Sequence, residues 1–150
     1  MKSRRKILLL LTLSVVIIFS AVWYFYNSQN QAMTNIFPAK ASRDCAPWDG
    51  AAFTVTIQYD AETIIDISVW QSPTITMPSS FRFTGDDEQI GNALIASGGG
   101  AFVPLRGEVW FERVEEGTPI EGRFRLTSER SELYEGRFVA EWESQIVYCG

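Results

Sequence analysis

The sequence repeats one short pattern three times, as RGEVWF (residues 106–111), EGRFRL (residues 121–126) and EGRFVA (residues 135–140). The glycines of the three segments stand 15 and 14 residues apart. That spacing fits a strand of about nine residues followed by a short turn, and the turns are supplied by residues 117–119 (GTP) and 128–131 (SERS). The repeat therefore predicts three consecutive antiparallel strands, a β-meander.

Alternation within the repeat divides its side chains into an apolar face and a charged face. The apolar face is expected to hold Val109, Phe111, Phe124, Leu126, Phe138, Ala140 and Trp142. The charged face is expected to hold Glu108, Glu112, Arg123, Arg125, Arg137, Glu141 and Glu143. Arginines of the middle strand would then lie beside glutamates of its neighbours, which fixes the register of the strands. The glycine early in each segment indicates a shared bend of the sheet.

The same period of two occurs upstream of the repeat. Residues 53–59 and 65–69 alternate apolar and polar side chains around a short connection, which predicts a hairpin. Shorter apolar pieces at residues 81–83 and 93–96 indicate further strands. With about eight strands and no helix in this part of the chain, we predict an all-β domain. Its strands are expected to form an antiparallel meander that makes a small barrel or a sandwich.

The N-terminus has a different composition. Lys2, Arg4, Arg5 and Lys6 precede residues 7–26, a stretch of 20 residues without a charge. A helix of this length spans roughly 30 Å, the thickness of the hydrocarbon core of a bilayer. We therefore predict a transmembrane signal anchor over residues 1–26, with the basic start in the cytoplasm and the rest of the chain outside. A cleaved signal peptide is the alternative, although no small-x-small cleavage site follows the apolar stretch.

Residues 27–44 are polar and lack periodicity, so they predict a flexible tether. Residues 45–150 are then the extracytoplasmic domain of a single-pass protein of the cell membrane. Cys45 and Cys149 flank this domain, and in an oxidising compartment they are expected to form a disulfide. Two free thiols or a metal-binding pair are the alternatives, but a zinc site would have to be completed by carboxylates.

The charge of the domain excludes several classes of function. Four of the 13 basic residues belong to the anchor segment, which leaves nine against 18 acidic residues, a net charge of −9. Such a domain is not expected to bind nucleic acid. The chain contains no histidine, the commonest general base, and a carboxylate pair is the only familiar catalytic route that remains. We therefore predict no enzymatic activity, no cofactor and no metal site; residues 86–88 are acidic but lack the spacing of a calcium loop.

Four side chains are candidates for binding a partner: Trp70, Trp110, Arg123 and Arg125. Both tryptophans fall on the polar side of their predicted strands, where an aromatic ring can contact a protein or stack on a sugar. We therefore predict a membrane-anchored binding module with an unknown protein or glycan partner. Two alternatives remain, a small barrel that carries a hydrophobic ligand and a structural subunit of a membrane complex.

Overall fold

A computed structural model of the chain describes residues 35–71, 79–85, 90–144 and 147–149. Within these residues there is no helix that is long and apolar enough to cross a membrane. The predicted anchor at residues 7–26 and the first part of the predicted tether lie outside them.

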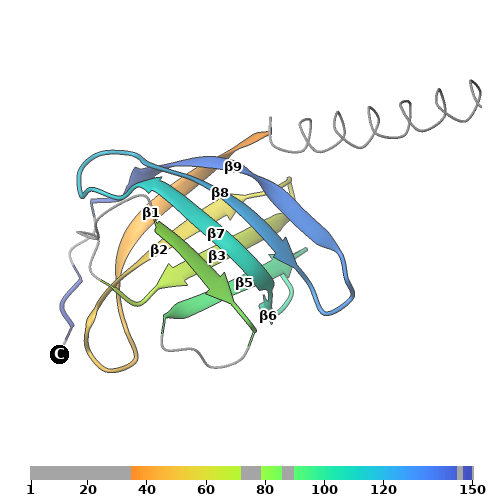
Figure 1. Cartoon of the computed structure of the whole chain (residues 1–150), viewed down its shortest axis with the longest axis horizontal. Coiled ribbons are helices and arrows are strands. Elements are labelled where there is room, and N and C mark those ends of the chain that lie inside the picture. The colour runs from red at the N-terminus through yellow and green to blue at the C-terminus, as the bar shows by residue number, and fades with distance from the viewer. Residues whose placement is uncertain (1–34, 72–78, 86–89, 145–146, 150) are drawn as a thin grey trace, which may run out of the picture. The chain divides into compact units, whose positions relative to one another are not determined.

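Nine strands make up the described part of the chain (Figure 1). They are β1 (Ile36–Cys45), β2 (Ala51–Gln58), β3 (Thr63–Val69), β4 (Ser79–Phe83), β5 (Gly91–Ser97), β6 (Val103–Pro104), β7 (Arg106–Arg113), β8 (Ile120–Thr127) and β9 (Leu133–Trp142). The prediction of an all-β domain is confirmed.

All nine strands belong to one sheet, with the order β4-β7-β8-β9-β1-β2-β3-β5-β6. The sheet curls into a half-barrel, so that β4, β7 and β8 pass in front of β1, β2 and β3 in Figure 1. A single curled sheet excludes the predicted alternative of two stacked sheets. The hairpin of β2 and β3 and the meander of β7, β8 and β9 are both confirmed, each with antiparallel pairing.

The start of the sheet differs from the prediction. Strand β1 (Ile36–Cys45) lies between β9 and β2, although we assigned all of it except Cys45 to the tether. It pairs with β9 in the parallel direction, so the sheet is not a purely antiparallel meander. Only Phe37, Ala39 and Ala41 of this strand face the core, and Pro38 interrupts their pattern. Small inward residues and a proline give too weak an alternation for a strand to be predicted.

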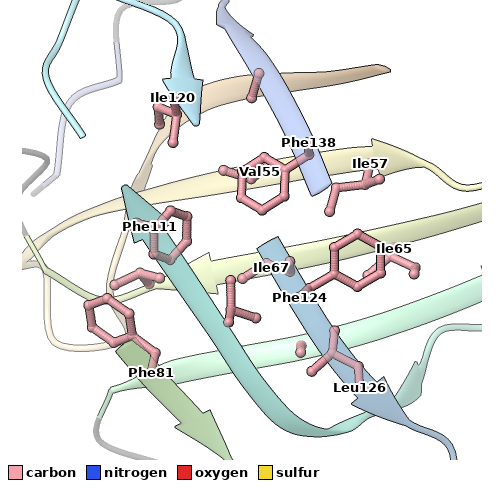
Figure 2. Packing of buried hydrophobic residues seen from close by; sticks show 14 of the residues in the cluster. Val55, Ile57, Ile65, Ile67, Phe81, Phe111, Ile120, Phe124, Leu126 and Phe138 are labelled. Atoms are coloured by element: carbon pink, nitrogen blue, oxygen red, sulfur yellow. The ribbon is translucent and has the colours of Figure 1, made fainter. Parts of the chain in front are cut away.

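The concave face of the sheet holds the hydrophobic core (Figure 2). Phe111 lies at its centre and is fully buried. Its ring packs edge-to-face against Phe53, Phe81 and Phe138, with ring centres 5.5, 5.6 and 5.8 Å away. Edge-to-face pairs at such distances contribute about 0.5–1.5 kcal/mol beyond the burial of their area. The predicted apolar face of the meander is therefore the face that packs.

Two glycines of the repeat allow the close packing of this face. A side chain at Gly122 would meet the carbonyl oxygen of Trp110 at 2.6 Å, and one at Gly136 would collide with the ring of Phe37. Both positions face inward and are buried. The predicted bend in the sheet therefore coincides with places where strands and rings approach too closely for any larger residue.

The sheet has two distinct ends. At one end, which we call the Asn35 end, lie the start of β1, the β2–β3 turn and the β8–β9 turn. At the other, the Cys45 end, a disulfide joins Cys45 at the end of β1 to Cys149, with Cα atoms 5.5 Å apart. The predicted disulfide is confirmed, and it ties the C-terminal segment to the strand that pairs with β9.

Candidate functional site

The convex face of β4, β7, β8 and β9 carries a ladder of opposite charges. Arg82 binds Glu108 across β4 and β7, and its Nε lies 2.8 Å from Glu108 Oε1. Glu108 also lies opposite Arg125, which in turn lies 3.5 Å from Glu135 in β9. The predicted placement of middle-strand arginines beside glutamates is confirmed for Arg125 and is wrong for Arg123, which lies opposite Trp110 and Arg137. Because the arginines of both pairs are largely exposed, each pair contributes little to stability and mainly sets register.

A second row crosses the same strands and contains the tryptophan. Trp110 in β7 lies opposite Arg123 in β8, and Arg123 lies opposite Arg137 in β9. The guanidinium carbon of Arg123 is 4.9 Å from the centre of the Trp110 ring, a cation–π contact. Arg137 is 3.2 Å from Glu112. Within the part of the chain that the structure describes, Arg123 forms no ion pair.

The two rows border a shallow hollow of about 410 Å³. Arg82, Glu108, Trp110 and Arg125 contribute to its lining. Three of the four candidate binding residues, Trp110, Arg123 and Arg125, are thus gathered on one patch, which we call the Trp110 face. Trp110 is half-buried, and Arg123 lies over its ring.

Trp70 does not belong to this patch. It follows β3, and β8, β9, β1 and β2 lie between β7 and β3 in the order of the sheet. Its ring packs edge-to-face against Trp48, with centres 5.5 Å apart, and its backbone N–H donates to Ile90 at 2.9 Å. Trp48 is 56% exposed and was not singled out by sequence, because it lies in a turn without periodicity.

A second concavity opens at the Asn35 end, between β6 and the β8–β9 turn. It has a volume of about 360 Å³, and we call it the Tyr134 cleft. Ile95, Val103, Pro104 and Tyr134 give it apolar walls, and Glu132 is among its polar residues. Sequence analysis missed this cleft because three separate segments build it. The inward position of Tyr134, in phase with Gly136 and Phe138, was the one available signal.

Aromatic rings and carboxylates adjoin this cleft. The hydroxyl of Tyr134 donates to Glu132 at 3.0 Å, and its ring packs against Tyr59 with centres 5.3 Å apart. Burial raises the pKa of Tyr134 above its usual value, and Glu132 and Asp60 raise it further. Burial likewise raises the pKa of Tyr59; a hydrogen bond with the backbone of Glu135 lowers it, and the charges of Glu135 and Asp60 raise it. Burial is therefore the main cause of the raised pKa of both tyrosines, and the negative charge of Asp60 adds to it.

Neither concavity has the composition of a metal centre. Among residues 35–71, 79–85, 90–144 and 147–149, no three His, Cys, Asp or Glu side chains are placed to hold one ion. The acidic residues 86–88 lie outside this part of the chain. Both cysteines are joined in the disulfide, so neither is available as a thiolate ligand or nucleophile.

Comparison of the chain with protein-family models, with curated proteins and with solved structures finds no match.

Proposed function

We propose that the protein is a membrane-anchored, extracytoplasmic binding module that uses the Trp110 face to hold an acidic segment of a partner protein. The observation that carries this proposal is the position of Arg123. It is stacked on Trp110, directly opposite a second arginine, and has no carboxylate partner among the described residues. A carboxylate from a partner would complete the unpaired guanidinium with two parallel hydrogen bonds.

The composition of the face supports protein recognition. Tryptophan and arginine are the residues most enriched at the energetic centres of protein interfaces. Strands β4, β7, β8 and β9 carry four arginines on this side, Arg82, Arg123, Arg125 and Arg137, although the residues beyond the anchor carry a net charge of −9. Three of these arginines are paired with glutamates of the same face, so an acidic partner segment would be attracted chiefly by Arg123 and repelled by much of the remaining surface.

A binding role also fits the other features of the chain. The core side chains fill the concave side of the sheet, which favours surface binding over transport of a hydrophobic ligand inside a barrel. The absence of histidine and the pairing of both cysteines favour binding over nucleophilic catalysis. The disulfide and the uncharged stretch at residues 7–26 support a domain held outside the cytoplasm.

The test uses the full chain in nanodiscs of zwitterionic lipid and a hexaglutamate peptide as the probe, measured by titration calorimetry. We expect binding that weakens as salt is added, and a loss of about tenfold or more in Arg123→Ala and Trp110→Ala. Arg43→Ala and Trp48→Ala are the matched controls, because both remove exposed side chains outside the Trp110 face. Equal losses in the controls would contradict the proposal.

Two further probes distinguish the partner class. Hexalysine is attracted by the acidic remainder of the domain, so its binding should not weaken in Arg123→Ala or Trp110→Ala, and an acidic oligosaccharide such as oligogalacturonate should bind more weakly than the peptide. Tighter binding of the oligosaccharide would replace the protein partner with a glycan.

The topology is tested separately: protease added to intact cells should digest residues 27–150 and spare the N-terminus. Protection of the domain would exclude an extracytoplasmic location.

A further inference from the structure

The Tyr134 cleft has the size and walls of a small-molecule site. Its volume of about 360 Å³ falls within the usual range for ligand pockets, roughly 300–1,000 Å³. Ile95 at its wall is buried, while Val103 is 51% exposed at its rim. The neighbouring Phe102 is 49% exposed, so the apolar surface continues outward from the cleft. These walls favour a ligand with an apolar body.

One carboxylate in the cleft is held in place by the chain itself. Glu132 Oε2 accepts hydrogen bonds from Tyr134 at 3.0 Å and from Ser128 Oγ at 3.3 Å. The backbone of the β8–β9 turn is fixed in the same way, because Ser128 N donates to Glu132 O at 3.0 Å. The carboxylate is thus positioned beside the aromatic ring before any ligand arrives, which reduces the entropy lost on binding.

The charges around the cleft select the sign of the ligand. Glu129 and Glu132 line it, against Arg130 as the one basic residue of the lining. Asp60 lies close enough to raise the pKa of both tyrosines behind it. In addition, the sequence has no lysine or arginine from residue 44 to residue 81, the segment that supplies β2 and β3. An anion would be repelled here, whereas a cation would be attracted.

We infer that the Tyr134 cleft binds an organic ammonium ion, with its apolar body against Ile95, Val103 and Pro104 and its charged nitrogen between Glu132 and the Tyr134 ring. An ammonium group beside a carboxylate and an aromatic ring gains both an ion pair and a cation–π contact. This site is separate from the Trp110 face, lies at the Asn35 end of the sheet, and does not depend on the proposed function.

Three probes of nearly equal size test the chemistry: 2-phenylethylammonium, 2-phenylethanol and 3-phenylpropanoate. Each is titrated calorimetrically into the full chain in nanodiscs of zwitterionic lipid, and the heat of empty nanodiscs is subtracted. We expect the ammonium to bind at least about tenfold more tightly than the alcohol, and the carboxylate to bind more weakly than both. Equal affinities for ammonium and alcohol would overturn the inference, because the cleft would then recognise apolar surface alone.

Substitutions test whether Glu132 belongs to the ammonium site. Glu132→Gln should weaken ammonium binding by about tenfold or more. Glu141→Gln, which removes an exposed carboxylate on the convex face of β9, should leave it unchanged. Trp110→Ala should also leave it unchanged, so that failure of this site and failure of the Trp110 face are separate results. Equal affinities of Glu132→Gln and Glu141→Gln would place the cation elsewhere and overturn the inference.

A measurement on the wild-type chain tests the site even if Glu132→Gln does not fold. Backbone amide shifts in NMR spectra should move on ammonium addition at residues 95–104 and 128–134. Shifts confined to residues 106–125, or spread evenly over the domain, would contradict the site.

Discussion

Arg123 and Arg137 lie directly opposite each other across β8 and β9, two like charges in one cross-strand pair. Such pairs destabilise a sheet, whereas opposite charges in the same position contribute roughly 0.2–1 kcal/mol. Arg137 is compensated by Glu112 at 3.2 Å, and Arg123 by the ring of Trp110. A like-charge pair lowers stability where an opposite-charge pair would raise it, and such a departure is where a binding role is expected.

This relationship predicts that stability and binding separate at position 123. Arg123→Glu places a carboxylate opposite Arg137, so the free energy of unfolding should stay the same or rise by up to about 1 kcal/mol. Binding of the hexaglutamate peptide should be lost. Urea unfolding of the full chain in nanodiscs measures the first effect, and calorimetry measures the second.

The control for this variant is the same change on the neighbouring strand. Arg137→Glu also places a carboxylate opposite an arginine, but it replaces the ion pair with Glu112 by repulsion, so it should be less stable than Arg123→Glu. If Arg123→Glu destabilised the domain by as much as Arg137→Glu, the stack on Trp110 would be structural and the argument for a binding site would fail.

The disulfide is expected to contribute a large part of the stability of the domain. It closes a loop with a sequence separation of 104 residues. For a loop of about 100 residues, the chain-entropy model gives about 4.7 kcal/mol, although measured values are often smaller. Replacing Cys45 and Cys149 together with serine should lower the melting temperature by more than about ten degrees.

Circular dichroism on heating, with and without a reducing agent, measures this loss. The reducing agent should lower the melting temperature of the wild type and leave the double variant unchanged. A double variant that melts within two or three degrees of the wild type, roughly the effect of less than 1 kcal/mol, would show that the bond contributes little.

Gly122 is predicted to tolerate no side chain. A Cβ atom there would lie 2.6 Å from the carbonyl oxygen of Trp110 and 2.5 Å from Phe138. Because the obstacle includes backbone, Gly122→Ala should cost about 1–3 kcal/mol. Glu121→Ala, one position away on the opposite face, should change stability by less than about 0.5 kcal/mol. Comparable losses in the two variants by urea unfolding would refute the packing role of the glycine.

The parts of the fold that the sequence predicted are those with strong alternation between large apolar and charged residues. In the meander, Phe111, Phe124 and Phe138 fixed the inward face, and the outward face followed from it. The contact of Trp110 with Arg123 was predictable for the same reason, because both point outward on neighbouring strands. Register between adjacent strands is a local consequence of pattern and turn length.

The parts that the sequence did not predict depend on contacts between distant segments. β1 pairs with β9, about 100 residues later, and its own inward residues Ala39 and Ala41 are too small to mark a strand. The Tyr134 cleft likewise needs β5, β6 and the β8–β9 turn to meet at one end of the sheet. Neither arrangement leaves a periodic signal in the sequence, because tertiary packing creates both.

Asp60 in the β2–β3 turn is predicted to make stability depend on acid pH. Its Oδ1 accepts hydrogen bonds from the backbone N–H groups of Glu62 at 2.9 Å and Thr63 at 2.8 Å. These donors favour the carboxylate and hold the pKa of Asp60 below its usual value of 3.8. The folded state therefore binds the proton less readily than the unfolded state does. The stabilisation is fully present above the usual pKa and is lost as the pH falls through the lowered one.

Asp60→Asn keeps an acceptor oxygen but removes the charge, so its turn should be insensitive to acid. The wild type should be more stable than Asp60→Asn near neutral pH, and the difference should shrink as the pH falls from about 4 to about 2. Urea unfolding midpoints across this range measure the effect. Glu141→Gln is the control, because the carboxylate of Glu141 accepts no hydrogen bond within the described part of the chain. A difference between wild type and Asp60→Asn that stayed constant over the whole range would show that the turn depends on the acceptor oxygen and not on its charge.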